Sequence, residues 1–225
     1  MSEERSSSIR SRWLDPTSSL GEVMFGLIMT LTFTLGAGII IEDEGREGAR
    51  ELLIALIGCN IAWGVIDAAL YLVGQMFDRG RLRRVGQAVR SAADVPSGVN
   101  LIASELDEWF EELMKPDERK ALYSRIVTNV RAKPPGENTV TKADFKGAWI
   151  SFWLVVLASA PAAIPFLILD DARLALRFSN GILLALLFLT GFFWARLTLG
   201  KPWIVGLSFL VVGFGLVALA IALGG

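Results

Sequence analysis

The chain has 225 residues, 53% of which are hydrophobic, and its formal net charge at pH 7 is −1. It contains no histidine and a single cysteine, Cys59, which excludes an intrachain disulfide, the usual zinc ligand sets and histidine-dependent nucleophiles. No basic patch with interleaved aromatic residues is present, so we expect no binding of nucleic acid.

The hydrophobic residues are separated from the charged ones in five long runs. Each run is long enough to cross a bilayer as a helix, which takes about 20 residues. The runs cover residues 20–41, 52–77, 148–169, 174–199 and 203–223, and an acidic loop over 42–50 is expected between the first two. Helix is the expected conformation because a lipid-exposed strand would leave its backbone groups unpaired. We therefore predict an all-α integral membrane protein with a five-helix bundle.

A charged insert lies between the second and third runs. The chain accordingly divides into a polar N-terminal segment (1–19), two spans (20–77), the insert (78–146) and three further spans (147–225). Apolar residues recur at helical spacing in the insert, which predicts three short amphipathic helices packed together or laid on the membrane. The three stripes are Leu82, Val85, Val89 and Ala92; Ile102, Leu106, Trp109 and Leu113; and Leu122, Ile126 and Val130.

The distribution of Lys and Arg predicts the orientation, because cytoplasmic segments of membrane proteins are enriched in these residues. If the N-terminus and the insert are cytoplasmic, 18 of the 22 basic residues lie inside, and only Arg46, Arg50, Arg173 and Arg177 lie outside. We expect the C-terminus outside and a location in a bacterial inner (plasma) membrane.

The second span carries the most informative pattern. Asn60, Gly64, Asp67, Tyr71 and Gly74 fall within a narrow arc of a helical wheel, and the opposite arc is apolar. An ionised Asp67 near the middle of a span costs at least about 2.5–3.5 kcal/mol, so it is expected to be paired, protonated or exposed to a water-filled cavity. A transport role is one interpretation. The other is that Asp67 pairs with a buried donor such as Asn180 or Asn60 and fixes helix packing.

Two further groups could bind a cation. Glu22 and Met29 share one line of the first span, and a carboxylate with a thioether suits Fe²⁺ or Mn²⁺ better than Mg²⁺. The alternative is that Glu22 lies at the boundary with the lipid headgroups and that Met29 only packs against other helices. In the insert, Glu105, Glu108 and Glu112 have the spacing of one helix face and could hold a hard cation. A solvated acidic face, or neutralisation by the Arg-rich first insert helix, explains the same residues.

The order of elements resembles that of the vacuolar iron transporter family. The segments GAWISFWLVVLASAPAAIPFLIL and GFFWARLTLGKPWIVGLSFLVVGFGLVALAIALGG are similar to the family's proline-containing third span and its closing pair of spans. The resemblance implies a homodimeric exporter of Fe²⁺ or Mn²⁺ driven by protons. In the second span the chain reads WGVIDAALY where the family has a Gly-Glu-Tyr element, and Asp67 is the nearest counterpart of its carboxylate. The stretch after that span, DRGRLRRVGQAVR, is basic where the family carries glutamates.

We therefore expect a proton-coupled exporter of a divalent cation. Asp67 is its predicted central ligand or proton carrier, Asn60 and Tyr71 lie beside it, and Glu22 with Met29 receives the ion from the cytoplasm. The expected partners are the lipid bilayer, the cation with protons, and a second copy of the chain. We expect no cofactor and no enzymatic activity, because no nucleophile–base pair is visible. Two alternatives stay open: a membrane anchor that presents the insert to a partner, and a transporter of a small organic solute.

The orientation is testable with reporters fused at Gly136 and at Gly225. We expect the first reporter to be active on the cytoplasmic side and the second on the opposite side, because an odd number of spans separates the two positions. Activity of both reporters on the same side would rule out five spans.

Overall fold

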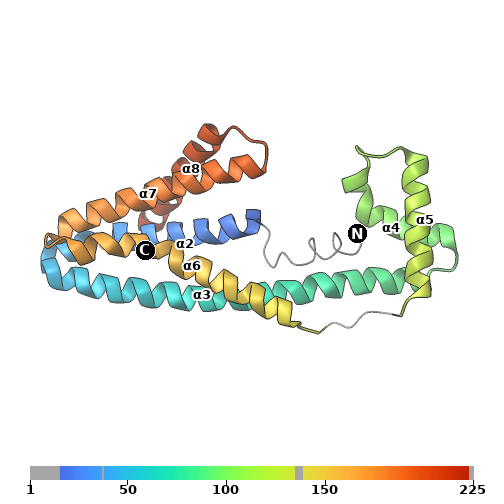
Figure 1. Cartoon of the computed structure of the whole chain (residues 1–225), viewed down its shortest axis with the longest axis horizontal. Coiled ribbons are helices and arrows are strands. Elements are labelled where there is room, and N and C mark those ends of the chain that lie inside the picture. The colour runs from blue at the N-terminus through green and yellow to red at the C-terminus, as the bar shows by residue number, and fades with distance from the viewer. Residues whose placement is uncertain (1–15, 37, 135–138, 223–225) are drawn as a thin grey trace, which may run out of the picture. The chain divides into compact units, whose positions relative to one another are not determined.

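The computed structural model describes residues 16–36, 38–134 and 139–222, and all regular structure within them is helical (Figure 1). The helices follow in the order α2 (Pro16–Gly36), α3 (Gly38–Ser91), α4 (Val95–Phe110), α5 (Pro116–Ala132), α6 (Lys142–Ile168), α7 (Ala172–Leu197) and α8 (Pro202–Ala222). The all-α class is thus confirmed for the described residues. Residues 1–15 of the N-terminal segment and the reporter positions Gly136 and Gly225 lie outside them.

Four of these helices, α2, α3, α6 and α7, are long and apolar enough to cross a membrane. Their candidate spans are Ser18–Leu35, Arg46–Ser91, Lys142–Ile168 and Ala172–Leu197. In α8 the apolar stretch found among the described residues, Pro202–Leu216, is shorter than the length required of a candidate span. The fifth span and the five-helix bundle therefore stay predictions, as does the division of the chain into four segments.

The acidic stretch 42–50, predicted as a loop, is helical. α2 ends at Gly36, and α3 begins at Gly38 and continues without interruption to Ser91. The prediction was wrong because charge alone does not end a helix: Glu, Arg and Ala are good helix formers, and the stretch contains no proline. Arg46 in this stretch forms an ion pair with Asp170, with 3.0 Å between Nη2 and Oδ1.

The first predicted helix of the insert is not separate but is the continuation of α3. Residues 78–91 contain no proline, and the next proline, Pro96, lies in the first turn of α4, where a missing N–H is tolerated. Asp94 caps α4 by accepting a hydrogen bond of 2.8 Å from the Ser97 backbone N–H. The hydrogen bonds from Ser97 lower the pKa of the Asp94 carboxyl group, so this cap persists over the whole neutral range.

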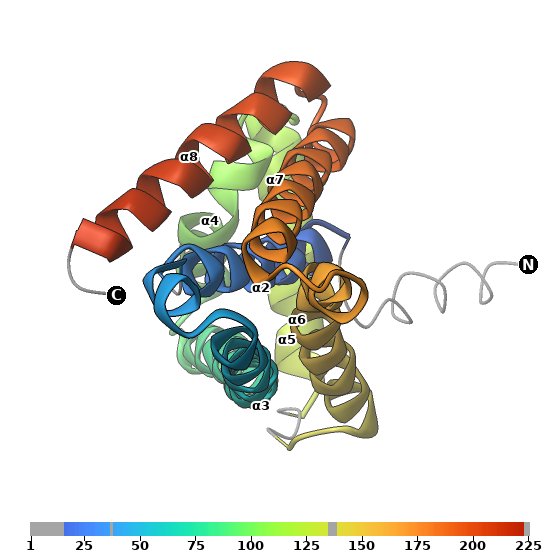
Figure 2. The same ribbon diagram turned by 90° about the vertical axis from the view of Figure 1, so that its left-hand side faces the viewer.

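The chain divides into two compact units, residues 1–71 with 142–225, and residues 72–141. In the first unit, Leu27 and Leu31 of α2 pack with Ala162 of α6 and Leu183 of α7 to form a buried core. Figure 2 views these helices nearly end-on and shows α2 beside α6 and α7, with α8 along α7. The core of this unit therefore lies at the junction of α2, α6 and α7.

Close approaches bring α6 against both α2 and α3. A Cβ atom at Gly26 of α2 would lie 2.9 Å from the carbonyl oxygen of Val155. A Cβ atom at Gly64 of α3 would lie 2.9 Å from the ring of Phe152, and any side chain at Gly147 of α6 would collide with the Tyr71 ring. Small residues at these positions allow the backbones to approach, as is typical of helix packing in membranes.

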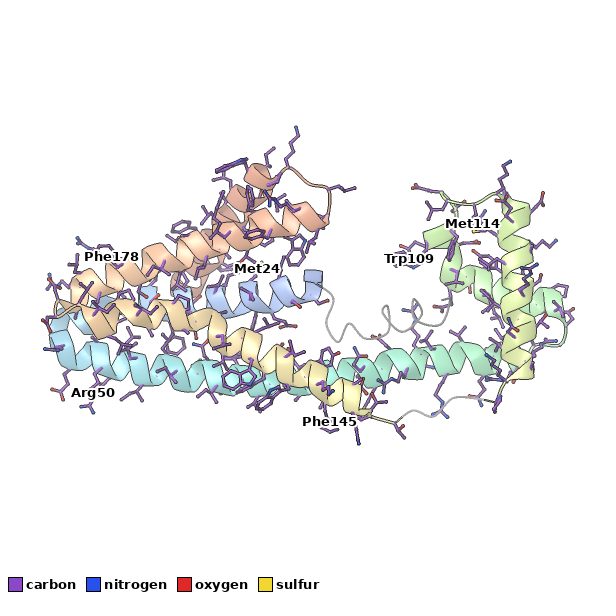
Figure 3. The ribbon with its side chains drawn as sticks, in the orientation of Figure 1. Met24, Arg50, Trp109, Met114, Phe145 and Phe178 are labelled. Carbon is purple, nitrogen blue, oxygen red and sulfur yellow. The ribbon has the colours of Figure 1, made fainter. Side chains whose placement is uncertain are left out.

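The second unit has a core of its own, to which α3, α4 and α5 all contribute. Its buried members are Val89, Val99, Ile102, Tyr123 and Val127. The predicted stripes supply this core only in part, because the positions farthest from it are solvent-exposed: Leu82 and Trp109 at 72% and Leu113 at 77%. Trp109 is labelled in Figure 3.

Two arginines close the second unit by capping each other's helices. Arg131 of α5 donates hydrogen bonds from Nη2 to the carbonyl oxygens of Ala92 and Asp94, at 2.6 and 2.8 Å. Arg90 of α3 donates from Nε to the carbonyl oxygen of Val130, at 3.0 Å. Each guanidinium thus satisfies carbonyl groups at or just beyond the C-terminal end of the other helix.

The close approach at Gly64 predicts opposite effects of alanine at two glycines of α3. A Cβ atom at Gly58 would meet no described neighbour within 4 Å, so Gly58→Ala should stabilise the protein slightly through helix propensity, by up to about 1 kcal/mol. Gly64→Ala should destabilise it by about 1–3 kcal/mol, because the methyl group overlaps Phe152. Thermal melting in detergent measures both, and equal shifts for the two variants would contradict close packing at Gly64.

Candidate functional site

The polar face of α3 is turned toward the interior of the first unit. Asn60 is 1% exposed and Gly64 is buried, and Asp67 and Tyr71 are half-buried. The opposite face is exposed, as expected for a lipid-facing surface: Ile61, Val65, Ile66 and Leu70. The arc seen in the sequence is therefore the buried side of this helix, except at Gly74, which is exposed.

Two carboxyl groups from different helices meet on this face. The side chain of Glu22, from α2, is hydrogen-bonded to that of Asp67, from α3. Two ionised carboxylates can only accept, so a direct bond between these groups forms only in the state in which one of them carries a proton. Like charges in contact, away from water, favour such sharing. Glu22 and Asp67 together are called the carboxyl pair below.

A third helix supplies a donor to the carboxyl pair. The hydroxyl group of Ser151, in α6, donates a hydrogen bond to Oδ2 of Asp67. Ser151 is fully buried, so this bond is shielded from solvent. The site therefore joins α2, α3 and α6 through three polar side chains.

The close approaches of the helices explain why these groups can meet. Gly26 lies one turn after Glu22 in α2, and Gly64 lies about one turn before Asp67 in α3. Gly64 packs against Phe152, the neighbour of Ser151, so α6 is near enough for the serine hydroxyl to reach Asp67. Larger side chains at these glycines would separate the three helices.

The two amides that the sequence offered as partners of Asp67 are engaged elsewhere. Oδ1 of Asn180 accepts a hydrogen bond of 2.6 Å from the Thr34 hydroxyl group. Nδ2 of Asn60 donates to the carbonyl oxygen of Leu56, in its own helix, at 2.8 Å. Sequence reasoning missed Ser151, because a single serine in an apolar run has no periodicity.

Met29 is half-buried in α2 and is separated from Glu22 by seven residues. At 1.5 Å of rise per residue this is about 10 Å along the helix, so Met29 does not belong to the carboxyl pair. The sequence predicted that a carboxylate and a thioether on one line of the first span could bind one cation. In the structure the two groups belong to different turns of α2.

The carboxylates of the insert do not form the full helix face that was predicted. α4 ends at Phe110, and Glu112 lies in the turn that follows. Oε2 of Glu105 pairs with Nη2 of Arg81 at 2.7 Å. Within the described ranges, no group of three or more His, Cys, Asp or Glu residues is arranged to hold a metal ion.

Another carboxylate of α4 stabilises the fold of the insert. Asp107 accepts hydrogen bonds from Arg119 at 3.0 Å and from the Tyr123 hydroxyl group at 2.9 Å. Burial, together with the bond to Asp107, raises the pKa of Tyr123. These contacts join α4 to α5 beside the core of the second unit.

The engagement of Glu105 and the position of Glu112 predict that these carboxylates contribute little to metal binding. The triple substitution Glu105→Gln, Glu108→Gln, Glu112→Gln should leave Mn²⁺ binding to the detergent-solubilised chain unchanged in calorimetry. Its control is the same titration of the unsubstituted chain. Loss of a saturable Mn²⁺ site in the triple variant would contradict the expectation.

Comparison with known proteins identifies a family. The model of a family described as the VIT family matches residues 88–225, which is more than half of the chain and includes the end of α3 and all of α4 to α8. A search of curated protein sequences finds no match.

Proposed function

The chain belongs to the VIT family, a family of membrane metal-cation transporters, and we propose that it exports Fe²⁺ or Mn²⁺ from the cytoplasm in exchange for protons. The observation that carries the proposal is the carboxyl pair between α2 and α3. Two acidic groups inside the membrane-spanning region are costly unless they handle a cation or a proton.

The carboxyl pair can serve both ions because they compete for the same oxygens. Removal from water favours the protonated form, whereas a bound divalent cation favours the ionised form. Binding of the cation therefore releases a proton, and arrival of a proton weakens binding of the cation. This competition is the physical basis of antiport at one site. Oxygen ligands of this kind are compatible with Mn²⁺ and Fe²⁺.

The remaining residues have roles that follow from their positions. Glu22 lies near the N-terminal end of α2, which we place at the cytoplasmic side, so it would receive the ion first. Tyr71 lies one turn from Asp67 and packs against Gly147, where it can hold α6 in place during exchange. Further parts of the proposal are assembly as a homodimer, a cytoplasmic insert and a bacterial inner membrane.

A membrane anchor that presents an interaction module is the second candidate function. A cavity of about 500 Å³ in the second unit is lined in part by Leu82, Leu106 and Trp109. Arg81 and Glu105, which form an ion pair, also line it. An apolar surface of this kind could receive a partner protein. Cation flux separates the two functions, because an anchor would conduct none.

Substitution Asp67→Asn tests the transport proposal. It keeps the size and hydrogen bonding of the side chain but removes its charge. We expect proton-coupled Mn²⁺ flux in proteoliposomes to fall to the level of empty liposomes, while the melting temperature in detergent is nearly unchanged. Glu22→Gln should behave in the same way.

Asp170→Asn is the matched control, because Asp170 is an exposed aspartate of the same unit and lies outside the carboxyl pair. Its flux should equal that of the unsubstituted chain. Normal flux in well-folded Asp67→Asn protein would show that Asp67 is not the coupling residue.

A further inference from the structure

A cavity lies at the end of the first unit where α3 begins and α6 is followed by α7 (Figure 1). Its volume is about 530 Å³, and all the residues that line it belong to this unit. The candidate spans begin at Arg46 in α3, end at Ile168 in α6 and begin again at Ala172 in α7, so the cavity lies at one boundary of the spans. Asp67 lies 17 residues after Arg50, or about 25 Å along α3, so this cavity is separate from the carboxyl pair.

The lining of the cavity changes from charged to apolar along the helices. The charged residues lie at the ends of the spans: Arg46, Glu47, Arg50 and Asp170. Leu53, Phe166 and Leu167 line the part that is nearer to the middle of the spans, and Leu167 is 77% exposed. A phospholipid has the same order of parts at the boundary of a bilayer, with a charged headgroup outside and apolar chains inside. The cavity therefore has the polarity of a lipid-binding site.

Two of the four charged side chains are already paired within the protein. Nη2 of Arg46 lies 3.0 Å from Oδ1 of Asp170. Arg50, which is labelled in Figure 3, and Glu47 form no ion pair with any described residue, although both line the cavity. The cavity thus offers one guanidinium group and one carboxylate to a ligand. A charged side chain one turn inside a span is costly among acyl chains, so its end is expected at the headgroups.

We propose that this cavity binds a phospholipid whose headgroup carries both a phosphate and a primary ammonium group, as in phosphatidylethanolamine. The guanidinium group of Arg50 binds the phosphate, to which it can donate two parallel hydrogen bonds. The carboxylate of Glu47 accepts a hydrogen bond from the ammonium group. An acyl chain lies against Leu53, Phe166 and Leu167. The proposal concerns a second ligand of the protein and does not depend on which ion is transported.

The charges of the cavity favour this headgroup over two others. The anionic headgroup of phosphatidylglycerol would satisfy Arg50 but would meet Glu47 as a like charge, which lowers affinity. Phosphatidylcholine has the same two charges as phosphatidylethanolamine, but its quaternary ammonium group has no N–H to donate to Glu47. It therefore loses a charge-assisted hydrogen bond, which is one of the stronger kinds.

The test is thermal melting of the full chain in detergent, with each of the three phospholipids added at the same concentration. A ligand that binds only the folded state raises the melting temperature. We expect the largest increase with phosphatidylethanolamine. Arg50→Gln should weaken its binding about tenfold, as expected for loss of a hydrogen bond between charged groups. Glu47→Gln should abolish the preference for phosphatidylethanolamine over the other two lipids.

Glu51→Gln and Arg173→Gln are the matched controls, because both residues are exposed at the same end of the unit and neither lines the cavity. Both variants should keep the lipid preference of the unsubstituted chain. Equal increases with all three lipids, unchanged in Arg50→Gln, would show that lipid covers the helices without recognition of a headgroup and would overturn the proposal. A larger increase with phosphatidylglycerol than with phosphatidylethanolamine would also overturn it, in favour of an anionic-lipid site. An equal increase with inorganic phosphate alone would overturn it in favour of a simple anion site.

Discussion

Contact between two carboxyl groups inside the membrane-spanning helices constrains the rest of this unit. Glu22 and Asp67 face each other there, and charge on carboxyl groups within a span is costly, so a bound cation or a proton stabilises the pair. Ser151 contributes a hydrogen bond from a third helix, and that bond persists only while α6 stays against α3. Helix packing and site occupancy are therefore coupled: whatever changes the charge of the pair also changes the force that holds the three helices together.

The glycines show how the sequence meets this constraint. Gly26 and Gly64 both bring α6 to a distance at which a Cβ atom would overlap its neighbours. Each lies close to one turn from a member of the carboxyl pair, so the closest packing occurs where a polar contact between helices is needed. Without a hydrophobic driving force between helices in lipid, such van der Waals contact is a main source of association. The same residues thus supply stability and position the site.

The buried polar face of α3 could be predicted from the sequence, whereas the contacts between different helices could not. The buried arc with Asn60, Gly64 and Asp67 follows from helical periodicity alone, since it concerns one helix. The contact of Glu22 with Asp67 depends on how α2 and α3 are aligned along their axes. That alignment could not be predicted from the sequence, because residues 42–50 were expected to form a loop and are helical. Ser151 could not be found because only tertiary packing distinguishes it from other serines in apolar spans. The helix face expected to include Glu112 is incomplete, because α4 ends at Phe110.

Charged residues of the second unit are used mainly to hold a small fold together. With about 70 residues it can bury only a modest core, so polar contacts matter more than in a larger domain. Arg90 and Arg131 cap helices, Arg119 joins Asp107, and Arg81 joins Glu105. A carboxylate that is already paired with a guanidinium has to lose this partner before it can bind a cation, which weakens any metal site built from it. The carboxylates of the membrane unit differ in this respect. No arginine is among the described partners of Glu22 and Asp67, so their oxygens stay available to an ion. This difference in pairing, more than the number of acidic residues, argues that the ion is handled by the membrane unit.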